Sequence, residues 1–373
     1  MHSTRARNNI ILVVMAVVIV ASGLVYVNSQ IMAPIRAKKP VVPAVAAIPT
    51  PTVNPTPAAK VAEMLMSESQ IGEAITQYKQ AVDQNANDAE AYASWGRALV
   101  YWGQTKEAVA KLEKAVQLSP KSAEYHAWLA HAYDWDGKYA QAVATAQKAL
   151  ELSPTLAVAH AFLGEAYADS GELDKGLASA KKALELDPKS ADAHRSMGYI
   201  LQAAGKFDEA EQEYRQAVDL KPRMGYYRLA LSRFYRRVGK FPEAIVQAQQ
   251  VVELEPNNPQ GFEGLGYTYY NQKQYDLAIV HFKKALELDP SRPATIAYMG
   301  WSYYLQEKYD MAITYFQDTV RLDPKHEDAF NGLGWSQYSM SRYGEATDAF
   351  KKALEINPNS ESAKKGLASL TSR

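Results

Sequence analysis

The chain contains no cysteine among its 373 residues. That absence excludes disulfide bonds, zinc sites with cysteine ligands, thiol catalysis and lipid attachment to an N-terminal cysteine. An excess of charge of one sign is also missing, because Lys+Arg and Asp+Glu both number 41. No general attraction to nucleic acid or to an anionic membrane surface follows from this balance, so we expect no nucleic-acid partner.

The motifs of common catalytic chemistry are missing as well. The sequence has no P-loop, no H-E-x-x-H pair and no G-x-S-x-G turn. The glycine pairs Gly264–Gly266 and Gly332–Gly334 fall inside predicted helices, so they form no phosphate-binding loop. No segment outside the repeats described below is long enough for a catalytic domain. We therefore expect no enzymatic activity, no cofactor and no bound metal.

What the sequence does have is a strict period. Prolines recur every 34 residues, with no insertion between them. They stand at Pro120, Pro154, Pro188, Pro222, Pro256, Pro290, Pro324 and Pro358. A fixed period of this length is typical of a repeat solenoid, in which each unit buries its apolar face only against its neighbours.

Each period contains two helical patterns. In residues 259–292, Leu265 and Tyr269 lie on one face of a first helix, and Ala278 and Phe282 lie on one face of a second. The proline of each period ends the second helix, because proline cannot continue it. Glycine separates the two helices in five repeats, where it can take the left-handed conformation that closes a helix. A column of small residues at 108, 142, 176, 210, 244, 278, 312 and 346 predicts close helix packing.

These residues closely resemble the tetratricopeptide repeat (TPR) family, whose pattern is W-x2-L-G-x2-Y, then Ala, Phe and Ala, then Pro. Residues 259–292 match it at Phe262, Leu265, Gly266, Tyr269, Ala278, Phe282, Ala285 and Pro290. The resemblance implies an all-α, right-handed superhelical solenoid of helical hairpins. We divide the array 60–373 into a degenerate repeat over about 58–88, eight full repeats over 89–360 and a polar capping helix at 361–373. In this family the first helices line a concave groove that binds an extended or helical peptide.

Two groups of residues are predicted to face the groove. The basic patch comprises Arg195, Arg233, Arg236 and Arg237. The aromatic wall comprises Tyr267, Tyr270, Trp301, Tyr304, Trp335 and Tyr338. Guanidinium groups would bind carboxylates of a partner, and aromatic faces would bind its apolar or proline side chains. The alternative is that the rings fill the inside of the superhelix and the arginines pair with nearby acids.

Three histidines also recur with the period, at His126, His160 and His194. They could form a metal ladder or pack at the helix interface. The packing interpretation is favoured, because a structural metal site needs three or four convergent ligands and these stand in the column where the family usually has Trp.

The N-terminus holds one apolar stretch. Residues 1–27 combine a basic tail with the uncharged segment Ile10–Val27, whose 18 residues reach roughly 27 Å as a helix. We favour an uncleaved transmembrane anchor, because apolar cores of signal peptides are shorter; cleavage near Ala21–Gly23 is the alternative and would give a secreted protein. Residues 28–59 contain seven prolines and are expected to form an extended linker.

Together these features predict a single-pass membrane protein with the array on the extracytoplasmic side, because a short basic N-terminus before an apolar stretch usually stays in the cytoplasm. Its predicted function is that of a scaffold or adaptor that binds a protein or peptide partner through the groove. One alternative is a structural or assembly factor of a cell-envelope complex that acts by oligomerisation. A third is a non-catalytic subunit of an enzyme complex.

Overall fold

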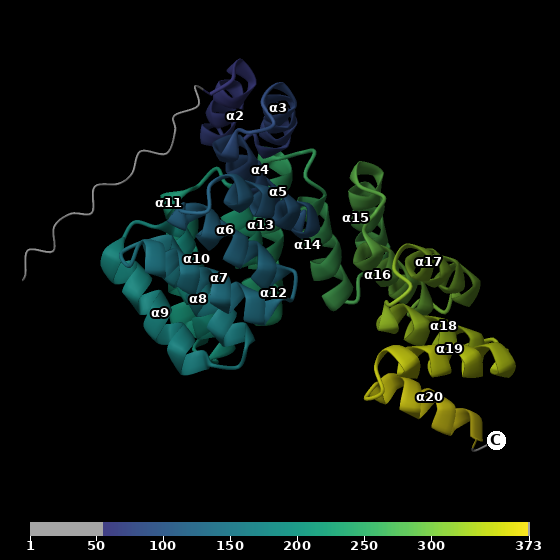
Figure 1. Cartoon of the computed structure of the whole chain (residues 1–373). Helices are drawn as coiled ribbons and strands as arrows, with labels where there is room; N and C mark the ends of the chain where they lie inside the picture. Colours follow the sequence, from purple (N-terminus) through teal and green to yellow (C-terminus); the bar gives the residue numbers. More distant parts are fainter. Residues whose placement is uncertain (1–54, 372–373) are drawn as a thin grey trace, which may run out of the picture. The chain divides into compact units, whose positions relative to one another are not determined.

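Helical hairpins follow one another along the chain in the computed structural model, which describes residues 55–371 (Figure 1). These residues contain helices and no strand. The helices are α2 (Pro57–Ser67), α3 (Ile71–Gln84), α4 (Ala89–Trp102), α5 (Thr105–Leu118), α6 (Ala123–Trp135), α7 (Tyr139–Leu152), α8 (Ala157–Asp169), α9 (Leu173–Leu186), α10 (Ala191–Ala203), α11 (Phe207–Leu220), α12 (Gly225–Arg237), α13 (Phe241–Leu254), α14 (Pro259–Asn271), α15 (Tyr275–Leu288), α16 (Pro293–Tyr304), α17 (Tyr309–Leu322), α18 (Glu327–Ser339), α19 (Tyr343–Ile356) and α20 (Glu361–Thr371). The predicted all-α solenoid is therefore confirmed.

The predicted anchor at Ile10–Val27 and nearly all of the linker at 28–59 lie outside the described residues. Within residues 55–371, no helix is both long and apolar enough to cross a bilayer.

Local sequence explains where the helices begin and end. The side chains of Asp88 and Ser122 cap α4 and α6 by accepting hydrogen bonds from the backbone N–H groups of Ala91 and Tyr125. Helix α4 ends at Gly103, whose φ of 78° places it in the left-handed region. The later repeats have Lys273, Glu307 and Ser341 at this position, and all three take a φ of 61°. The repeat geometry thus imposes a left-handed turn even on residues with a side chain.

Small residues let the two helices of a repeat approach closely. Seven members of the predicted small column are alanines with no exposed surface, at 108, 142, 210, 244, 278, 312 and 346. In the C-terminal repeats, Phe282, Phe316 and Phe350 fill the space between helices and are fully buried. A Cβ atom at Gly332 would lie only 2.3 Å from Cζ of Phe316, so glycine is required there by packing.

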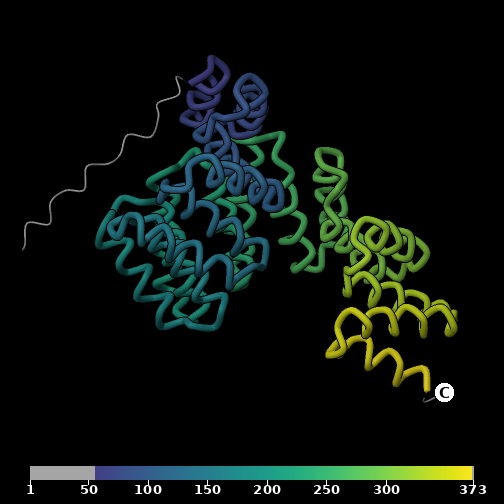
Figure 2. Tube along the Cα trace, in the orientation of Figure 1, coloured from purple at the N-terminus to yellow at the C-terminus, as the bar shows by residue number. Residues whose placement is uncertain are grey.

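Helices that are far apart in sequence also meet. The ring of Tyr101 in α4 lies 4.9 Å from that of Tyr226 in α12, and the side chain of Gln260 in α14 lies against Gly103. Tyr227 reaches the same cluster, with its ring 6.4 Å from Tyr101. The Cα trace in Figure 2 can be followed through the repeats that separate these helices. Part of the groove-facing side of the early repeats is therefore covered by the chain itself.

Candidate functional site

The four arginines of the basic patch do not share one environment. Arg195 in α10 is buried and its guanidinium donates to both carboxylate oxygens of Glu165, which also accepts from the hydroxyl of Ser196. Burial alone would lower the pKa of Arg195, but the charge of Glu165 raises it overall. Arg195 is therefore fully committed inside the protein, as the alternative interpretation of the patch predicts.

The other three arginines lie on α12 and face a cavity of about 610 Å³. We call it the central cavity. It is lined by Asp134, Trp135, Tyr139, Glu165, Asp169, Arg195, Tyr199, Gln202, Tyr214, Ala230, Arg233, Arg236, Arg237 and Asn271. Most of these residues come from the first helices α6, α8, α10 and α12, so the cavity is a hollow in the predicted groove that is partly open to solvent.

No ion pair of Arg233, Arg236 or Arg237 is found within the described part of the chain. Arg233 lies 5.8 Å above the ring of Trp135, and Arg236 lies 5.4 Å above that of Tyr267. Desolvation lowers the pKa of Arg233 and of Arg236, because no close carboxylate offsets it. Arg233 and Arg237 are nevertheless exposed to solvent, and Arg236 is partly exposed. Apart from Arg195, the members of the basic patch therefore have no ion-pair partner among the described residues.

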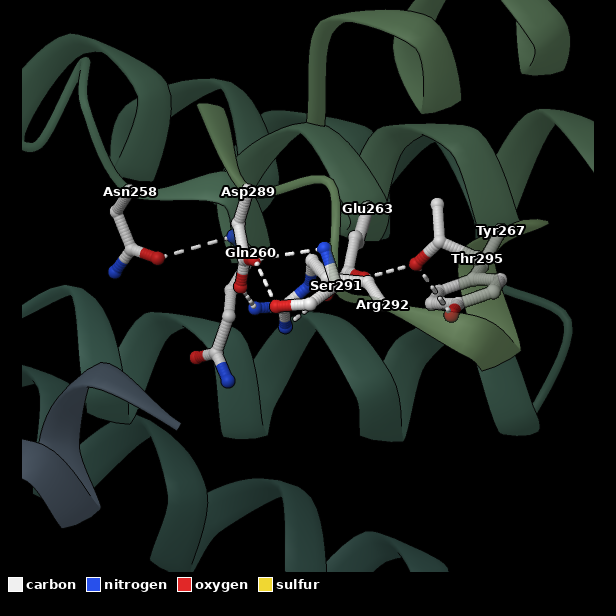
Figure 3. A network of polar contacts seen from close by, with 8 residues as sticks. All are labelled: Asn258, Gln260, Glu263, Tyr267, Asp289, Ser291, Arg292 and Thr295. Atoms are coloured by element: carbon white, nitrogen blue, oxygen red, sulfur yellow. Dashed lines mark hydrogen bonds and ion pairs between the residues drawn. The ribbon is translucent and has the colours of Figure 1, made fainter. Parts of the chain in front are cut away.

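The carboxylate whose charge acts on Arg233 is Glu263, and it is already engaged. Its oxygens accept from Nε and Nη2 of Arg292, at 2.7 and 2.8 Å, and from the hydroxyl of Thr295. Arg292 also bonds Asp289 at 3.0 Å, which completes a closed network at the start of α16 (Figure 3). Glu263 thus stabilises the α14–α16 junction instead of neutralising the patch.

Acidic residues line the central cavity as well. Asp134 is 3% exposed, and its carboxyl group is hydrogen-bonded to that of Asp169. Burial, reinforced by the charges of Glu165 and Asp169, raises the pKa of Asp134 to about 9. Burial also raises the pKa of Asp169, although the hydroxyl of Tyr199 donates to it and acts the other way. Asp134 is therefore protonated at neutral pH.

The aromatic wall lies on α14, α16 and α18, and all six rings are partly exposed. Trp301 packs edge-on against Phe316 at 5.1 Å, and Trp335 packs in the same way against Phe350 at 5.2 Å. Tyr267 repeats the arrangement with Phe282 at 5.2 Å. One part of each ring thus belongs to the core and another part reaches solvent.

Hydrogen bonds fix the two indoles in place. Nε1 of Trp301 donates to Asp328 at 2.7 Å, and Nε1 of Trp335 donates to Ser362 at 2.9 Å. Each acceptor lies 27 residues further along, Asp328 in the next repeat and Ser362 in the capping helix α20. The two indoles are therefore held in place, and little of their side-chain entropy remains to be lost when a ligand binds.

Equivalent positions in the early repeats differ in exposure. His131 and Glu165 occupy the column of Tyr267 and Trp301 and are 0% and 1% exposed, whereas Arg97 and Tyr199 in the same column are partly exposed. Nε2 of His131 shares a hydrogen bond of 3.0 Å with the hydroxyl of Tyr226. Helix α12 thus covers His131.

Sequence reasoning missed Tyr226 and Tyr227, which close the early groove. The signal was present, because no other full repeat has an aromatic residue at the position of Tyr226, which is occupied by Glu90, Glu124, Val158, Asp192, Gln260, Ala294 and Asp328. A single bulky aromatic residue in such a column indicates a contact beyond the next repeat.

The periodic histidines bond the backbone. Nε2 of His126, His160 and His194 lies 3.0, 3.0 and 3.1 Å from the carbonyl oxygen of the proline six residues earlier. Each is partly buried at the start of its first helix. The interaction joins each first helix to the turn before it. The histidines therefore act through a hydrogen bond to the backbone as well as through the predicted packing at the helix interface.

The fold and the partly open concave face define the class of helical-repeat solenoids. Within that class, models of the tetratricopeptide repeat match residues 96–134, 123–156, 163–225, 259–292, 298–326 and 327–360, which together make up more than half of the chain. The chain belongs to the tetratricopeptide repeat family.

Solved structures show the same fold in other proteins. A crystal structure of the anaphase-promoting-complex hetero-tetramer Cut9–Hcn1 aligns with a TM-score of 0.62 and 18% identity over 80% of this chain. This chain spans 59% of the length of that one. A tetratricopeptide repeat protein from Parabacteroides merdae aligns with a TM-score of 0.51 and 16% identity, over 68% of this chain and 99% of that one. No curated protein sequence matched. TPR proteins bind protein partners, which is the level of function that the family establishes.

Proposed function

We propose that this protein is a membrane-tethered scaffold that recruits a protein partner through the aromatic wall. The observation that carries the proposal is a continuous row of partly exposed aromatic rings along one groove. His131 and Glu165 are buried at the equivalent positions of two early repeats, whereas the six rings on α14, α16 and α18 are all partly exposed, and hydrogen bonds hold the two indoles in place. Tyr and Trp held in this way are the residue types that dominate binding energies at protein interfaces.

The proposed ligand is an extended segment rich in apolar or proline side chains. Aromatic rings offer flat faces to such side chains, and proline-rich segments lose little entropy on binding because they are already extended. The segment Ile10–Val27 would anchor the protein, the linker at 28–59 would separate the array from the bilayer, and the array would lie on the extracytoplasmic side. In this role the protein assembles other chains and catalyses no reaction.

The first prediction tests the aromatic wall. We expect Trp301→Ala with Tyr304→Ala in the full chain, purified in detergent, to weaken partner binding about 30-fold or more, since interface hot spots contribute about 2 kcal/mol or more. Phe207→Ala is the matched control, because Phe207 is an aromatic residue with 47% exposure on a second helix, outside the wall. Partner capture by in-cell crosslinking, followed by titration of the purified pair, provides the measurement.

Equal binding by the wild type and the Trp301/Tyr304 variant would reject the wall as the interface. A stable oligomer in light scattering whose formation depends on Trp301 would instead assign the wall to self-association, and would favour the assembly-factor alternative.

A further inference from the structure

We propose that the central cavity is a binding site for a small dianionic ligand that presents a phosphate group or two carboxylates. The site is separate from the aromatic wall, and the proposal goes beyond the scaffold function. It rests on the size of the cavity and on the three arginines of α12 that line it without forming an ion pair within residues 55–371.

The size of the cavity fits a small molecule. Its volume of about 610 Å³ falls within the range of roughly 300–1,000 Å³ that ligand pockets occupy. Aromatic surface from Trp135, Tyr139 and Tyr214 accompanies the charged groups. Polar groups that converge on a partly aromatic cavity are the usual composition of a specific ligand site.

The charges around the cavity do not balance. Arg195 and Glu165 neutralise each other. Burial and the neighbouring acids raise the pKa of Asp134, and burial raises that of Asp169, so this pair carries less negative charge than two free carboxylates. Arg233, Arg236 and Arg237 line the same cavity, and none of them forms an ion pair with another described residue. The lining therefore has an excess of positive charge, which a dianion would balance.

The geometry of the donors suits acidic oxygens. Guanidinium groups bind phosphate and carboxylate through paired N–H donors, which is why arginine is preferred over lysine for such groups. The carboxyl group of Asp134, which also lines the cavity, is hydrogen-bonded to that of Asp169, so it does not compete with the ligand for the guanidinium groups.

The second prediction tests this site by calorimetry. The full chain in detergent is titrated at pH 7.5 with inorganic phosphate and, separately, with succinate, so that the two arms distinguish a phosphate from a dicarboxylate ligand. We expect one of these dianions to bind, and we expect Arg236→Gln with Arg237→Gln to weaken it at least about tenfold, because both changes remove charged donors. Acetate, with one charge, should bind more weakly.

The matched control is Lys221→Gln with Arg223→Gln. Both residues are exposed in the turn before α12, and their removal changes the net charge by the same amount without touching the cavity. If the arginine pair proves necessary for folding, Arg237→Gln alone is sufficient, since Arg237 is exposed and its substitution leaves the core intact. Asp134→Asn should retain binding, because an amide also donates a hydrogen bond.

Failure of both dianions to bind the wild type would overturn the proposal. So would equal weakening in the control pair, which would show that the ions bind only to surface charge. Neither result bears on the aromatic wall, whose test depends on Trp301 and Tyr304.

Discussion

At the scale of a single residue, burial in the groove changes the ionisation of Asp134. In an open groove this carboxyl group would be hydrated and ionised. Here α8 and α10 surround it, and the neighbouring acids Glu165 and Asp169 oppose its ionisation. Arg195 does not compensate fully, because its guanidinium is held by Glu165. A buried acid is thus kept neutral by its surroundings.

The third prediction follows from this raised pKa. The carboxyl group of Asp134 has a pKa of about 9 in the folded protein and of about 3.8 in the unfolded chain. Between these two pH values the folded protein binds more protons than the unfolded chain, so the free energy of unfolding decreases as the pH rises toward 9. The charged groups around Asp134 are Glu165, Asp169 and Arg195, with neutral His131 on its own helix. We expect the melting temperature of the wild type to fall between pH 7 and pH 9, and that of Asp134→Asn to fall by several degrees less.

Asp348→Asn serves as the control for this measurement, because Asp348 is an exposed carboxylate on α19. It should follow the wild type across the whole range. Parallel curves for Asp134→Asn and the wild type would show that Asp134 ionises normally, and the argument for its neutral state would fail.

At the scale of helices, the distance between two backbones is set by the smallest residues at their crossing. Helices α8 and α9 cross where Gly164 faces Gly176, the one glycine of the small column. A Cβ atom at Gly176 would lie 2.8 Å from the carbonyl oxygen of Gly164. Because that oxygen belongs to the backbone, only a shift of the helix could relieve the contact.

The fourth prediction compares two glycines on second helices. Gly176→Ala should lower the free energy of unfolding by about 1–3 kcal/mol through overpacking. Gly344→Ala, on α19, should instead raise it by up to about 1 kcal/mol, since no atom lies within 4 Å of its added Cβ and alanine favours the helix. Urea denaturation measures both. Opposite signs are required, and a stabilising Gly176→Ala would show that α8 and α9 have room to separate.

At the scale of the described array, contacts between distant repeats depart from the pattern of a simple solenoid. In a simple repeat protein each unit touches only its neighbours, so unfolding can begin at either end. The contact of Tyr101 with Tyr226 and Tyr227 instead connects α4 to α12. His131 contributes through its hydrogen bond to Tyr226. The repeats between these helices are therefore closed into one cooperative unit.

The fifth prediction tests this cooperativity with a double-mutant cycle of Tyr101→Ala and Tyr226→Ala. We expect a coupling energy of about 0.5–1.5 kcal/mol between the two rings. We also expect the double variant to show more unfolding transitions than the wild type. Tyr303 and Tyr315 provide the local control, because their rings stack at 5.2 Å within one repeat. Changing both Tyr303 and Tyr315 to Ala should lower the free energy of unfolding without adding an unfolding transition. If the two double variants unfold with the same number of transitions, the contact between α4 and α12 does not create a cooperative unit.

Much of the candidate site could be predicted from the repeat register. Because every period places the same position on the same face, the register brought Arg233, Arg236 and Arg237 together and aligned the six aromatic residues on one side. It could not show that Arg195 pairs with Glu165, since the two lie 30 residues apart on adjacent helices with side chains that reach across the groove. It also gave no warning that His131 and Asp134 are buried.

The sequence by itself determined the helical hairpins, their boundaries and the face that each side chain occupies. It could do so because these features depend on contacts within a repeat and with the next one, and the 34-residue period encodes both. Only the tertiary structure decided which part of the groove is closed and which part is open. That outcome depends on small rotations that accumulate from repeat to repeat until α12 meets α4, and no single period contains their sum.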